Sequence, residues 1–504
     1  MCGIVGEHGG PSPEEGRRML ERITHRGPDD HGEVQVGDTW LGHTRLSIVD
    51  VKSGKQPLST DDDQFFLVGN GEVYNHEHVK VGLEHDTSYA TKSDNEVALH
   101  LVREKGPDAL DELEGMFAFL IAGEDGFFMA ARDPVGIKPL YWAESDGVYR
   151  FASEMHSFEP DWRPWVEVFP PGHYWTPAGG LERFADAVPR DPAHEHPEAE
   201  PSEADLTETR DELIGSVHRQ MMGDVPVGVF LSGGLDSTLI AAIAARYLAE
   251  RGERLKTFAV GTEQSSDLAA ARQAAAYLDT EHHERVYTAE EAEAVLPDVV
   301  RSIEHFDPSL VRSAVPNYLL AEMTAEHVKV VLTGEGADEL FAGYEYLADL
   351  EHPEELHDEI VRTVEGLHNL NLQRADRVTM AHGLEARVPF LDREVIALAL
   401  RLPAQWKLAP PGTQEKMLLR RAFEGWLPHE LLYRDKEQFG DGSGAADVLT
   451  HKLEETVSDD DFEAERDLVS PSFRTKEELA YFRIWSEHLG GVRPEVTLAR
   501  FATA

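Results

Sequence analysis

The sequence has a single cysteine in 504 residues, Cys2, which directly follows the initiator Met. One thiol excludes a disulfide within the chain and any metal cluster built from several cysteines. Such sparse cysteine fits a reducing compartment, so the sequence predicts a cytoplasmic protein. A structural cysteine could lie anywhere, so its position at the start of the chain needs an explanation.

Long apolar runs and basic residues are also scarce. No apolar run approaches the roughly 20 residues that span a bilayer, and no charged segment precedes an apolar one at the N-terminus, which predicts no membrane association. Lys and Arg total 47 against 94 Asp and Glu, so the formal net charge is −47. The acids are spread along the whole chain and would repel nucleic acid. Their mutual repulsion is screened at molar salt, which predicts a halophilic, archaeal source.

The chain is too long for one ordinary core, so two or more domains are expected. Residues 2–185 contain short β runs and turns, typical of a mostly β or α+β domain. Residues 186–206 are rich in Pro, Glu and Ala and are interpreted as a linker. In residues 207–504, "VPVGVFLSGG", "KTFAV" and "VKVVLTGEG" alternate with helical patterns. They predict a doubly wound parallel sheet that binds ligands at its carboxyl edge, with a helical part beyond about residue 350.

The strongest local motif is "FLSGGLDST", from Phe230 to Thr238, between a predicted strand and helix. It is not a Walker A loop, because no Lys follows the glycines, and a dinucleotide fingerprint would need a third Gly. It resembles the pyrophosphate-binding loop of ATP pyrophosphatases, with Asp236 as a Mg2+ ligand. The alternative is a plain helix cap after a glycine turn. A second loop, "TGEGADEL", places Glu335 and Asp338 at another strand end and favours a nucleotide–metal site.

Removal of Met1 would make Cys2 the first residue, whose α-amino group could act as general base for the thiol. The alternative is an incidental cysteine in a frayed terminus. Four further motifs, "HRGPDD", "LGHTRLSIVD", "GNGEVYNH" and "KSDNEV", accompany "MCGI" in residues 2–97. Together they resemble the N-terminal-nucleophile glutamine amidotransferase domain, whose fold is an αββα sandwich.

This resemblance implies roles for particular residues of the first domain. Cys2 would attack the side-chain amide of glutamine, and Asn70 and Gly71 would form the oxyanion hole. Arg45 would bind the α-carboxylate of glutamine. The implied glutamine pocket comprises Arg45, Leu46, Ser47, Ile48, Val49, Asn70, Gly71, Glu72 and Asp94.

An ammonia-releasing domain joined to an adenylating one resembles the class B, glutamine-hydrolysing asparagine synthetase family over essentially the full length. Further matching motifs are "TFAVG", "EHHERV", "HGLEARVPFLD" and "RDKEQFGDG". The resemblance implies that glutamine, aspartate and ATP are substrates, that Mg2+ is required, and that a homodimer is the assembly to consider. Glu335 would assist formation or aminolysis of a β-aspartyl-AMP intermediate. The implied ATP site comprises Phe230, Leu231, Ser232, Gly233, Gly234, Asp236, Ser237, Val260, Thr333, Gly334, Asp338 and Lys436, with Asp236 and Asp338 as metal ligands.

Some alternatives stay open. A related amidotransferase could act on another carboxylate, such as a sugar acid or a peptide; a β-lactam-forming relative or a catalytically silent protein fits the intact motifs less well. Two stretches depart from the family pattern: "PSLVR" keeps only Ser309 of two hydroxyl residues before Arg312, and "FAGY" has Ala342 in place of Gly. Arg312 is a weaker candidate for a phosphate or carboxylate contact. Within "LEARVPFLD" we expect an internal salt-bridge set of Glu385, Arg387 and Asp392, with Glu385 or Asp392 near the substrate.

The excess of acidic residues predicts that salt stabilises the protein. Raising KCl from about 0.1 M to about 1 M shortens the Debye length from about 10 Å to about 3 Å and should raise the unfolding temperature. Thermal unfolding measured at both concentrations checks this, with sucrose as the uncharged control. An unfolding temperature that is independent of KCl would contradict a halophilic adaptation.

Overall fold

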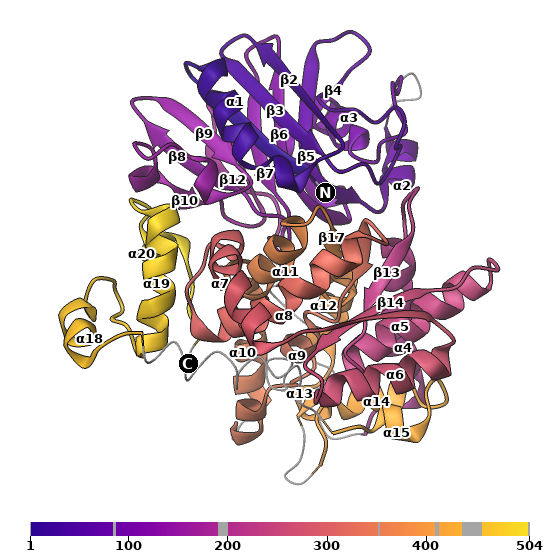
Figure 1. Ribbon diagram of the computed structural model, residues 1–504. Coiled ribbons are helices and arrows are strands. Elements are labelled where there is room, and N and C mark those ends of the chain that lie inside the picture. The colour runs from indigo at the N-terminus through magenta and orange to yellow at the C-terminus, as the bar shows by residue number, and fades with distance from the viewer. Residues whose placement is uncertain are drawn as a thin grey trace.

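The computed structural model describes residues 2–83, 87–189, 200–350, 353–408, 413–435 and 456–501. The N-terminal strands form one domain, which rests on a second domain made of a parallel sheet and many helices (Figure 1). Within the described residues, no helix is long and apolar enough to cross a membrane.

The first domain contains two six-stranded antiparallel sheets that pack face to face, with the strand orders β10-β8-β9-β1-β3-β2 and β12-β11-β7-β6-β5-β4. The first sheet consists of β1 (Cys2–His8), β2 (Asp30–Val36), β3 (Thr39–Arg45), β8 (Tyr141–Ser145), β9 (Val148–Ala152) and β10 (Glu167–Val168). The second consists of β4 (Leu58–Ser59), β5 (Phe65–Val73), β6 (Gly115–Gly123), β7 (Phe128–Arg132), β11 (His173–Thr176) and β12 (Gly180–Arg183).

Buried side chains from facing strands, including Ile4, Leu41, Val68 and Leu120, fill the space between these sheets. The helix α1 (Pro13–Arg22) packs on β1 and β3, while α3 (Glu96–Lys105), which follows α2 (His76–Gly82), packs on β5. Helices therefore cover the outer faces of both sheets, and the predicted αββα sandwich is confirmed.

The second domain is built on a five-stranded parallel sheet with the order β15-β14-β13-β16-β17. The strands are β13 (Val227–Phe230), β14 (Lys256–Gly261), β15 (Glu281–Val286), β16 (Val330–Leu332) and β17 (Glu385–Arg387). The order reverses between β13 and β16, so a crevice is expected at the carboxyl ends of these two strands. The predicted doubly wound sheet is confirmed.

Two strands of this sheet were not predicted from the sequence, whose patterns indicate the other three. β15 is a polar edge strand, and β17 has only three residues and lies in the part expected to be helical. Neither has the apolar run by which buried parallel strands are recognised.

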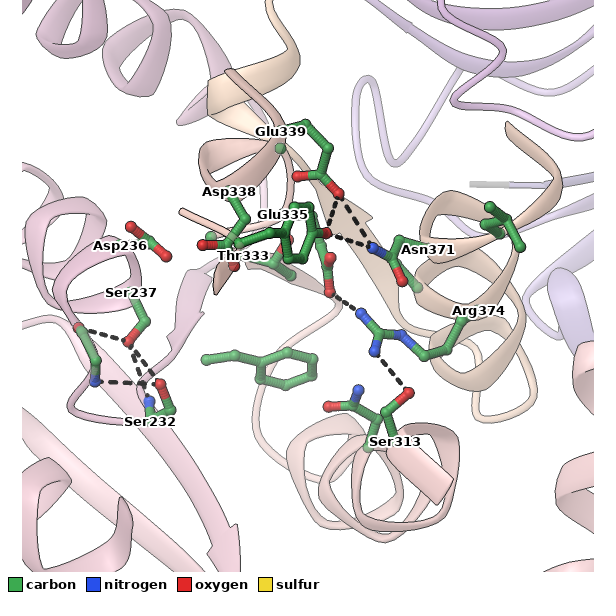
Figure 2. Close-up of a pocket in the computed structure, with 18 of the residues that line it drawn as sticks. Ser232, Asp236, Ser237, Ser313, Thr333, Glu335, Asp338, Glu339, Asn371 and Arg374 are labelled. Atoms are coloured by element: carbon green, nitrogen blue, oxygen red, sulfur yellow. Dashed lines mark hydrogen bonds and ion pairs between the residues drawn. The ribbon is translucent and has the colours of Figure 1, made fainter. Parts of the chain in front are cut away.

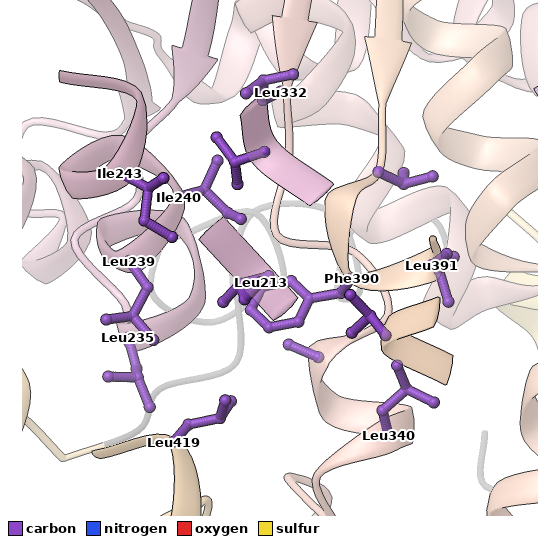
Figure 3. Close-up of a cluster of buried hydrophobic side chains, with 14 of the residues drawn as sticks. Leu213, Leu235, Leu239, Ile240, Ile243, Leu332, Leu340, Phe390, Leu391 and Leu419 are labelled. Atoms are coloured by element: carbon purple, nitrogen blue, oxygen red, sulfur yellow. The ribbon is translucent and has the colours of Figure 1, made fainter. Parts of the chain in front are cut away.

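Helices cover the sheet and extend beyond it. They are α4 (Glu203–Gln220), α5 (Leu235–Ala249), α6 (Ser266–Leu278), α7 (Ala289–Ile303), α8 (Pro308–Ala325), α9 (Ala337–Leu340), α10 (Pro353–Gly366), α11 (Asn371–Met380), α12 (Arg393–Arg401), α13 (Ala404–Lys407), α14 (Met417–Ala422), α15 (His429–Leu432), α18 (Asp459–Glu465), α19 (Lys476–Leu489) and α20 (Pro494–Thr497). Apolar side chains of α4, α5, β16 and the segment after β17, such as Leu213, Ile240, Leu332 and Phe390, form the core (Figure 3).

The helix α4 begins within the stretch interpreted as a linker. The Ser202 hydroxyl accepts a hydrogen bond from the Asp205 amide, and the Asp205 carboxylate accepts one from the Ser202 amide. This reciprocal capping box supplies hydrogen-bond acceptors to two backbone N–H groups that have none at the start of a helix. It therefore stabilises a helix start at Glu203. Residues 190–199 of the interpreted linker lie outside the described residues.

A buried ionic cluster joins the two domains. Arg26 of the first domain bonds Glu154 of its own domain at 2.6 Å and Asp376 of α11 at 2.9 Å. Arg377 of α11 bonds Glu154 at 3.0 Å and Glu304 at 3.2 Å. All five side chains are buried. Arg26 and Arg377 each pair with one acid of the first domain and one of the second. The cluster therefore fixes how the domains meet.

We expect Arg377→Met to destabilise the protein by about 3–5 kcal/mol, because it leaves Glu154 and Glu304 buried with less compensating charge. The matched control is Arg493→Met, which breaks an exposed pair with Glu167 across the same two domains and should cost under about 1 kcal/mol. Denaturant unfolding at constant high salt measures both. Equal costs for the two variants would show that the cluster does not hold the domains.

Candidate functional site

The thiol of Cys2 lies buried at the start of β1, beside the groups predicted to act with it. Cys2 stands opposite Arg45 in the antiparallel pair of β1 and β3. The Cys2 amide donates to the Asn70 Oδ1 at 3.0 Å. Burial raises the pKa of the Cys2 thiol, and the negative charge of Glu72 nearby acts in the same direction. The thiol is therefore protonated at neutral pH and needs a base to become a nucleophile.

Asn70 and Gly71 on β5 have the properties that an oxyanion hole requires. Because the Asn70 Oδ1 accepts from Cys2, its Nδ2 amide group points elsewhere, and this buried donor has no hydrogen-bond partner among the described residues. Gly71 has a φ of +146°, and a Cβ there would lie 1.9 Å from the Met116 carbonyl oxygen. Only glycine fits this backbone. A donor held beside the thiol with no partner is suited to developing negative charge.

The predicted glutamine pocket is assembled around this thiol. Arg45 donates to the backbone carbonyls of Val49 at 3.2 Å and Asp50 at 2.8 Å, which holds the loop from Leu46 to Val49 around its guanidinium. Leu46, Ser47 and Ile48 of this loop are buried. The Ile48 carbonyl accepts from the Asp224 amide, so the loop also contacts the second domain.

Two buried carboxylates, Glu72 and Asp94, complete this group. The Asp94 carboxylate accepts from the Val73 amide at 2.6 Å, and Glu72 lies 3.6 Å from Arg387 of β17. Burial raises the pKa of both carboxyls, and neighbouring acids raise that of Glu72 further. The predicted glutamine pocket thus touches the second domain directly through Arg387.

The second site is a cavity of about 860 Å³ at the carboxyl edge of the parallel sheet. Its lining includes every residue predicted for ATP except two: Phe230, Leu231, Ser232, Gly234, Asp236, Ser237, Val260, Thr333, Gly334 and Asp338, and also Glu335. Gly233 does not line the cavity; its φ of +77° and its contact with Ala270 require glycine there. Lys436 lies outside the described residues.

The loop between β13 and α5 is held by its own hydroxyl groups. The Ser232 and Ser237 hydroxyls lie 3.0 Å apart, the Ser232 amide donates to the Ser237 hydroxyl, and the Gly234 amide donates to that of Ser232 (Figure 2). The loop opens the long helix α5, whose positive dipole end favours an anion. Hydroxyls and amides thus converge at a helix start, as phosphate binding requires.

Opposite this loop, an ion pair and a carboxylate network form the other wall of the cavity (Figure 2). Glu335 pairs with Arg374 of α11, and Arg374 also donates to the Ser313 hydroxyl at 2.8 Å. The Glu339 carboxylate accepts from the Tyr344 hydroxyl at 2.6 Å and from the Asn371 amide at 3.1 Å. Burial raises the pKa of Glu339, and the neighbouring Asp338 adds to this effect.

Arg374 and Lys416 are among the basic residues at this cavity that were not predicted from the sequence. Lys416 precedes α14, and its ammonium group lies 2.6 Å from Asp236 and 2.7 Å from Asp338. The spacing of Asn371 and Arg374, one helical turn apart, was the available signal for the α11 face. Nothing in the sequence around Lys416 marks it, because its partners lie in two distant loops.

The secondary candidates have mixed surroundings. Arg312 lines the cavity and pairs with Glu477 at 3.4 Å, and Ser309 lines it too. Ala342, which departs from the family pattern, has a left-handed φ of +53°, a conformation that favours glycine. Glu385 bonds Arg387 as expected.

Asp392 is the exception in that predicted salt-bridge set. Its carboxylate caps α12 and pairs with Arg219 at 2.9 Å. Asp392 therefore belongs to a separate pair at the start of α12.

Comparison with known proteins agrees with this pair of sites. Residues 1–169 match the glutamine amidotransferase domain family, and residues 208–353 and 348–492 match the asparagine synthase family. The chain thus combines an amidotransferase domain with a synthase domain. An asparagine synthetase [glutamine-hydrolyzing] of Asparagus officinalis is 40% identical over 472 residues, covering 88% of this chain and 78% of that protein.

Two further relatives show the same breadth. The asparagine synthetase [glutamine-hydrolyzing] 3 of Arabidopsis thaliana is 40% identical, covering 88% of this chain and 79% of its own length. A probable asparagine synthetase [glutamine-hydrolyzing] of Schizosaccharomyces pombe is 38% identical, covering 96% and 92%. The chain belongs to the family of glutamine-hydrolysing asparagine synthetases.

The geometry at Cys2 predicts a specific role for the Asn70 amide. Asn70→Asp keeps an oxygen to accept from Cys2 but replaces the Nδ2 donor, so the turnover of glutamine should fall by about 100- to 1,000-fold. Ammonia release from glutamine measures this. Asn75→Asp, five residues along the same segment, is the control and should retain most activity. Little loss in Asn70→Asp would place the oxyanion hole elsewhere.

Proposed function

We propose that the protein makes asparagine from aspartate, using ammonia from glutamine and the adenylating power of ATP. The observation that carries this proposal is the presence of both sites in one chain. A buried thiol in the first domain lies beside an amide donor that has no hydrogen-bond partner in the described part of the chain. A hydroxyl-lined helix start faces carboxylates across one cavity in the second.

In the first domain, the α-amino group exposed by removal of Met1 would take the proton of the Cys2 thiol. The thiolate attacks the side-chain carbonyl carbon of glutamine, and the Asn70 amide and the Gly71 backbone N–H stabilise the negative oxygen. The same amino group returns its proton to the leaving ammonia, and water then cleaves the thioester. Arg45 holds the α-carboxylate of glutamine, and Asp94 and Glu72 hold its α-amino group.

In the second domain, Ser232, Gly234 and Ser237 would hold the pyrophosphate part of ATP, and Phe230, Leu231 and Val260 the adenosine. Asp236 and Asp338 fit a Mg2+ ion, because their hard carboxylate oxygens already converge on one cation, the Lys416 ammonium. Bound Mg2+ would neutralise phosphate charge. The β-carboxylate of aspartate attacks the α-phosphorus, pyrophosphate leaves, and ammonia displaces AMP from the β-aspartyl adenylate. Glu335 would accept the proton that the attacking ammonia loses.

Ammonia must pass from one site to the other inside the protein, since in water near neutral pH it would become ammonium and lose its nucleophilic lone pair. A small cavity of about 20 Å³ between the domains supports such a route. Tyr74, Met116 and Ile137 of the first domain and Gln220 and Val388 of the second line it, together with the charged side chains of Glu114, Asp392 and Arg393. Its volume suits one small molecule.

The test uses purified protein in high salt with glutamine, MgATP and aspartate, and measures the products of the reaction. We expect asparagine, AMP and pyrophosphate in equal amounts. With aspartate carrying 18O in the β-carboxylate, one 18O atom should appear in AMP, because the adenylate retains the carboxylate oxygen on phosphorus. Glutamine hydrolysis without asparagine would contradict aspartate as the acceptor and favour the alternative of another carboxylate, such as a sugar acid or a peptide.

Cys2→Ala separates the two sites. It should abolish synthesis from glutamine and leave synthesis from added ammonium chloride within about twofold of the wild type, because the second site contains no part of the thiol machinery. Since Cys2 is the only cysteine, the variant changes no other thiol. Loss of the ammonia-dependent reaction as well would contradict the division into two sites.

A further inference from the structure

Lys416 is a buried cation placed between the two loops of the synthetase site. It lies directly before α14 with a left-handed φ of +57°, a backbone conformation that lysine seldom adopts. Its ammonium group contacts Asp236, in the first turn of α5, at 2.6 Å and Asp338, in α9, at 2.7 Å. One ammonium group thus contacts the segment that follows β13 and the segment that follows β16.

The surrounding chain makes room for this arrangement. A Cβ at Gly343 would lie 1.9 Å from the Asp338 Oδ1 and 2.4 Å from the Lys416 Cε, so only glycine allows both side chains to meet. A lysine side chain is ordinarily a cation at physiological pH, and this one faces two carboxylates.

The same two carboxylates are those that fit a divalent cation. Mg2+ binds carboxylate oxygens at about 2.0–2.1 Å, and the oxygens facing the Lys416 ammonium are already engaged. Two cations held by the same pair of oxygens would repel each other strongly. A metal ion can therefore take these same two oxygens only if the ammonium group moves.

A buried ammonium group that loses its carboxylates needs another anion, because an unpaired buried charge is strongly unfavourable. Lys416 lines the same cavity as Ser232 and Ser237, where the proposed function places the pyrophosphate. Its four-carbon stem is flexible, and an ammonium group binds phosphate as a point charge.

We propose that Lys416 is an exchangeable counter-ion: its ammonium group competes with the divalent cation for Asp236 and Asp338, and transfers to the polyphosphate when metal and nucleotide bind together. This inference rests on the proposed function of the cavity as a metal–ATP site. Competition from the ammonium group makes the protein bind the metal weakly when the metal is alone and strongly when polyphosphate is also present. Lys416 would thus couple the two ligands and favour adenylation only when both are present.

The test measures the binding of Mn2+, a paramagnetic probe for Mg2+, by electron paramagnetic resonance at constant ionic strength without aspartate or glutamine. In Lys416→Met the competitor is gone, so Mn2+ alone should bind about 10-fold more tightly than to the wild type. Mn2+ with ATP should bind about 10-fold more weakly, because the phosphate contact is lost. A merely structural lysine would not tighten metal binding when removed.

Two control variants sharpen the comparison. Lys476→Met removes a lysine that does not line the cavity and pairs with Asp459 at 2.7 Å, and it should change neither affinity. Lys416→Arg keeps a cation and should bind Mn2+ alone no more tightly than the wild type does. Unchanged or weakened binding of Mn2+ alone in Lys416→Met would overturn the proposal.

The wild type supplies a test that does not depend on a variant folding. Its affinity for Mn2+ should rise at least about 10-fold when inorganic pyrophosphate is present. If the wild type binds Mn2+ with equal affinity in the presence and absence of pyrophosphate, the proposed exchange of Lys416 is wrong. A wild type that fails to bind Mn2+ with ATP at all would instead contradict the proposed function of the cavity, so the two failures are distinguishable.

Discussion

The buried ionic cluster between the domains is the constraint on which both sites depend. Arg26 and Glu154 come from the first domain, and Asp376, Arg377 and Glu304 from the second. Removing such charges from water costs several kcal/mol per ion, which only close and complete pairing offsets. A sliding interface would leave charges buried without partners, so the domains can meet in essentially one orientation.

The helix α11 carries this constraint to both sites. Asp376 holds Arg26, whose Nε donates to the Cys2 carbonyl at 3.1 Å. Two residues earlier, Arg374 pairs with Glu335 in the synthetase cavity. A shift of α11 would therefore disturb the thiol and the proposed proton acceptor together. The interface that fixes the domains also fixes the relative positions of the two reactions, as transfer of a small uncharged intermediate requires.

The parts of the sites that the sequence predicted are those formed by short loops at strand ends. Ser232, Asp236, Glu335 and Asp338 meet because the carboxyl ends of neighbouring parallel strands meet at one edge. The burial of α11 was not predicted, because "NLQRADRVTM" has three charged residues in ten and is typical of an exposed helix, although nine of the ten are buried. The ionic partners of α11 and of Lys416 are 39 to 350 residues away in the sequence. The spacing of residues along the chain cannot predict pairs at such separations.

The same pairing explains how an acidic protein can hold anionic substrates. Acids outnumber bases 94 to 47 in the whole chain, whereas nine acidic and seven basic side chains line the described part of the synthetase cavity. At molar salt the repulsion between exposed charges is screened within a few ångströms, while buried pairs are screened much less. At such salt, recognition of ATP and aspartate would depend on contacts at hydrogen-bond distance, and the cations placed there, Arg374 and Lys416 among them, would act largely independently of the surface charge.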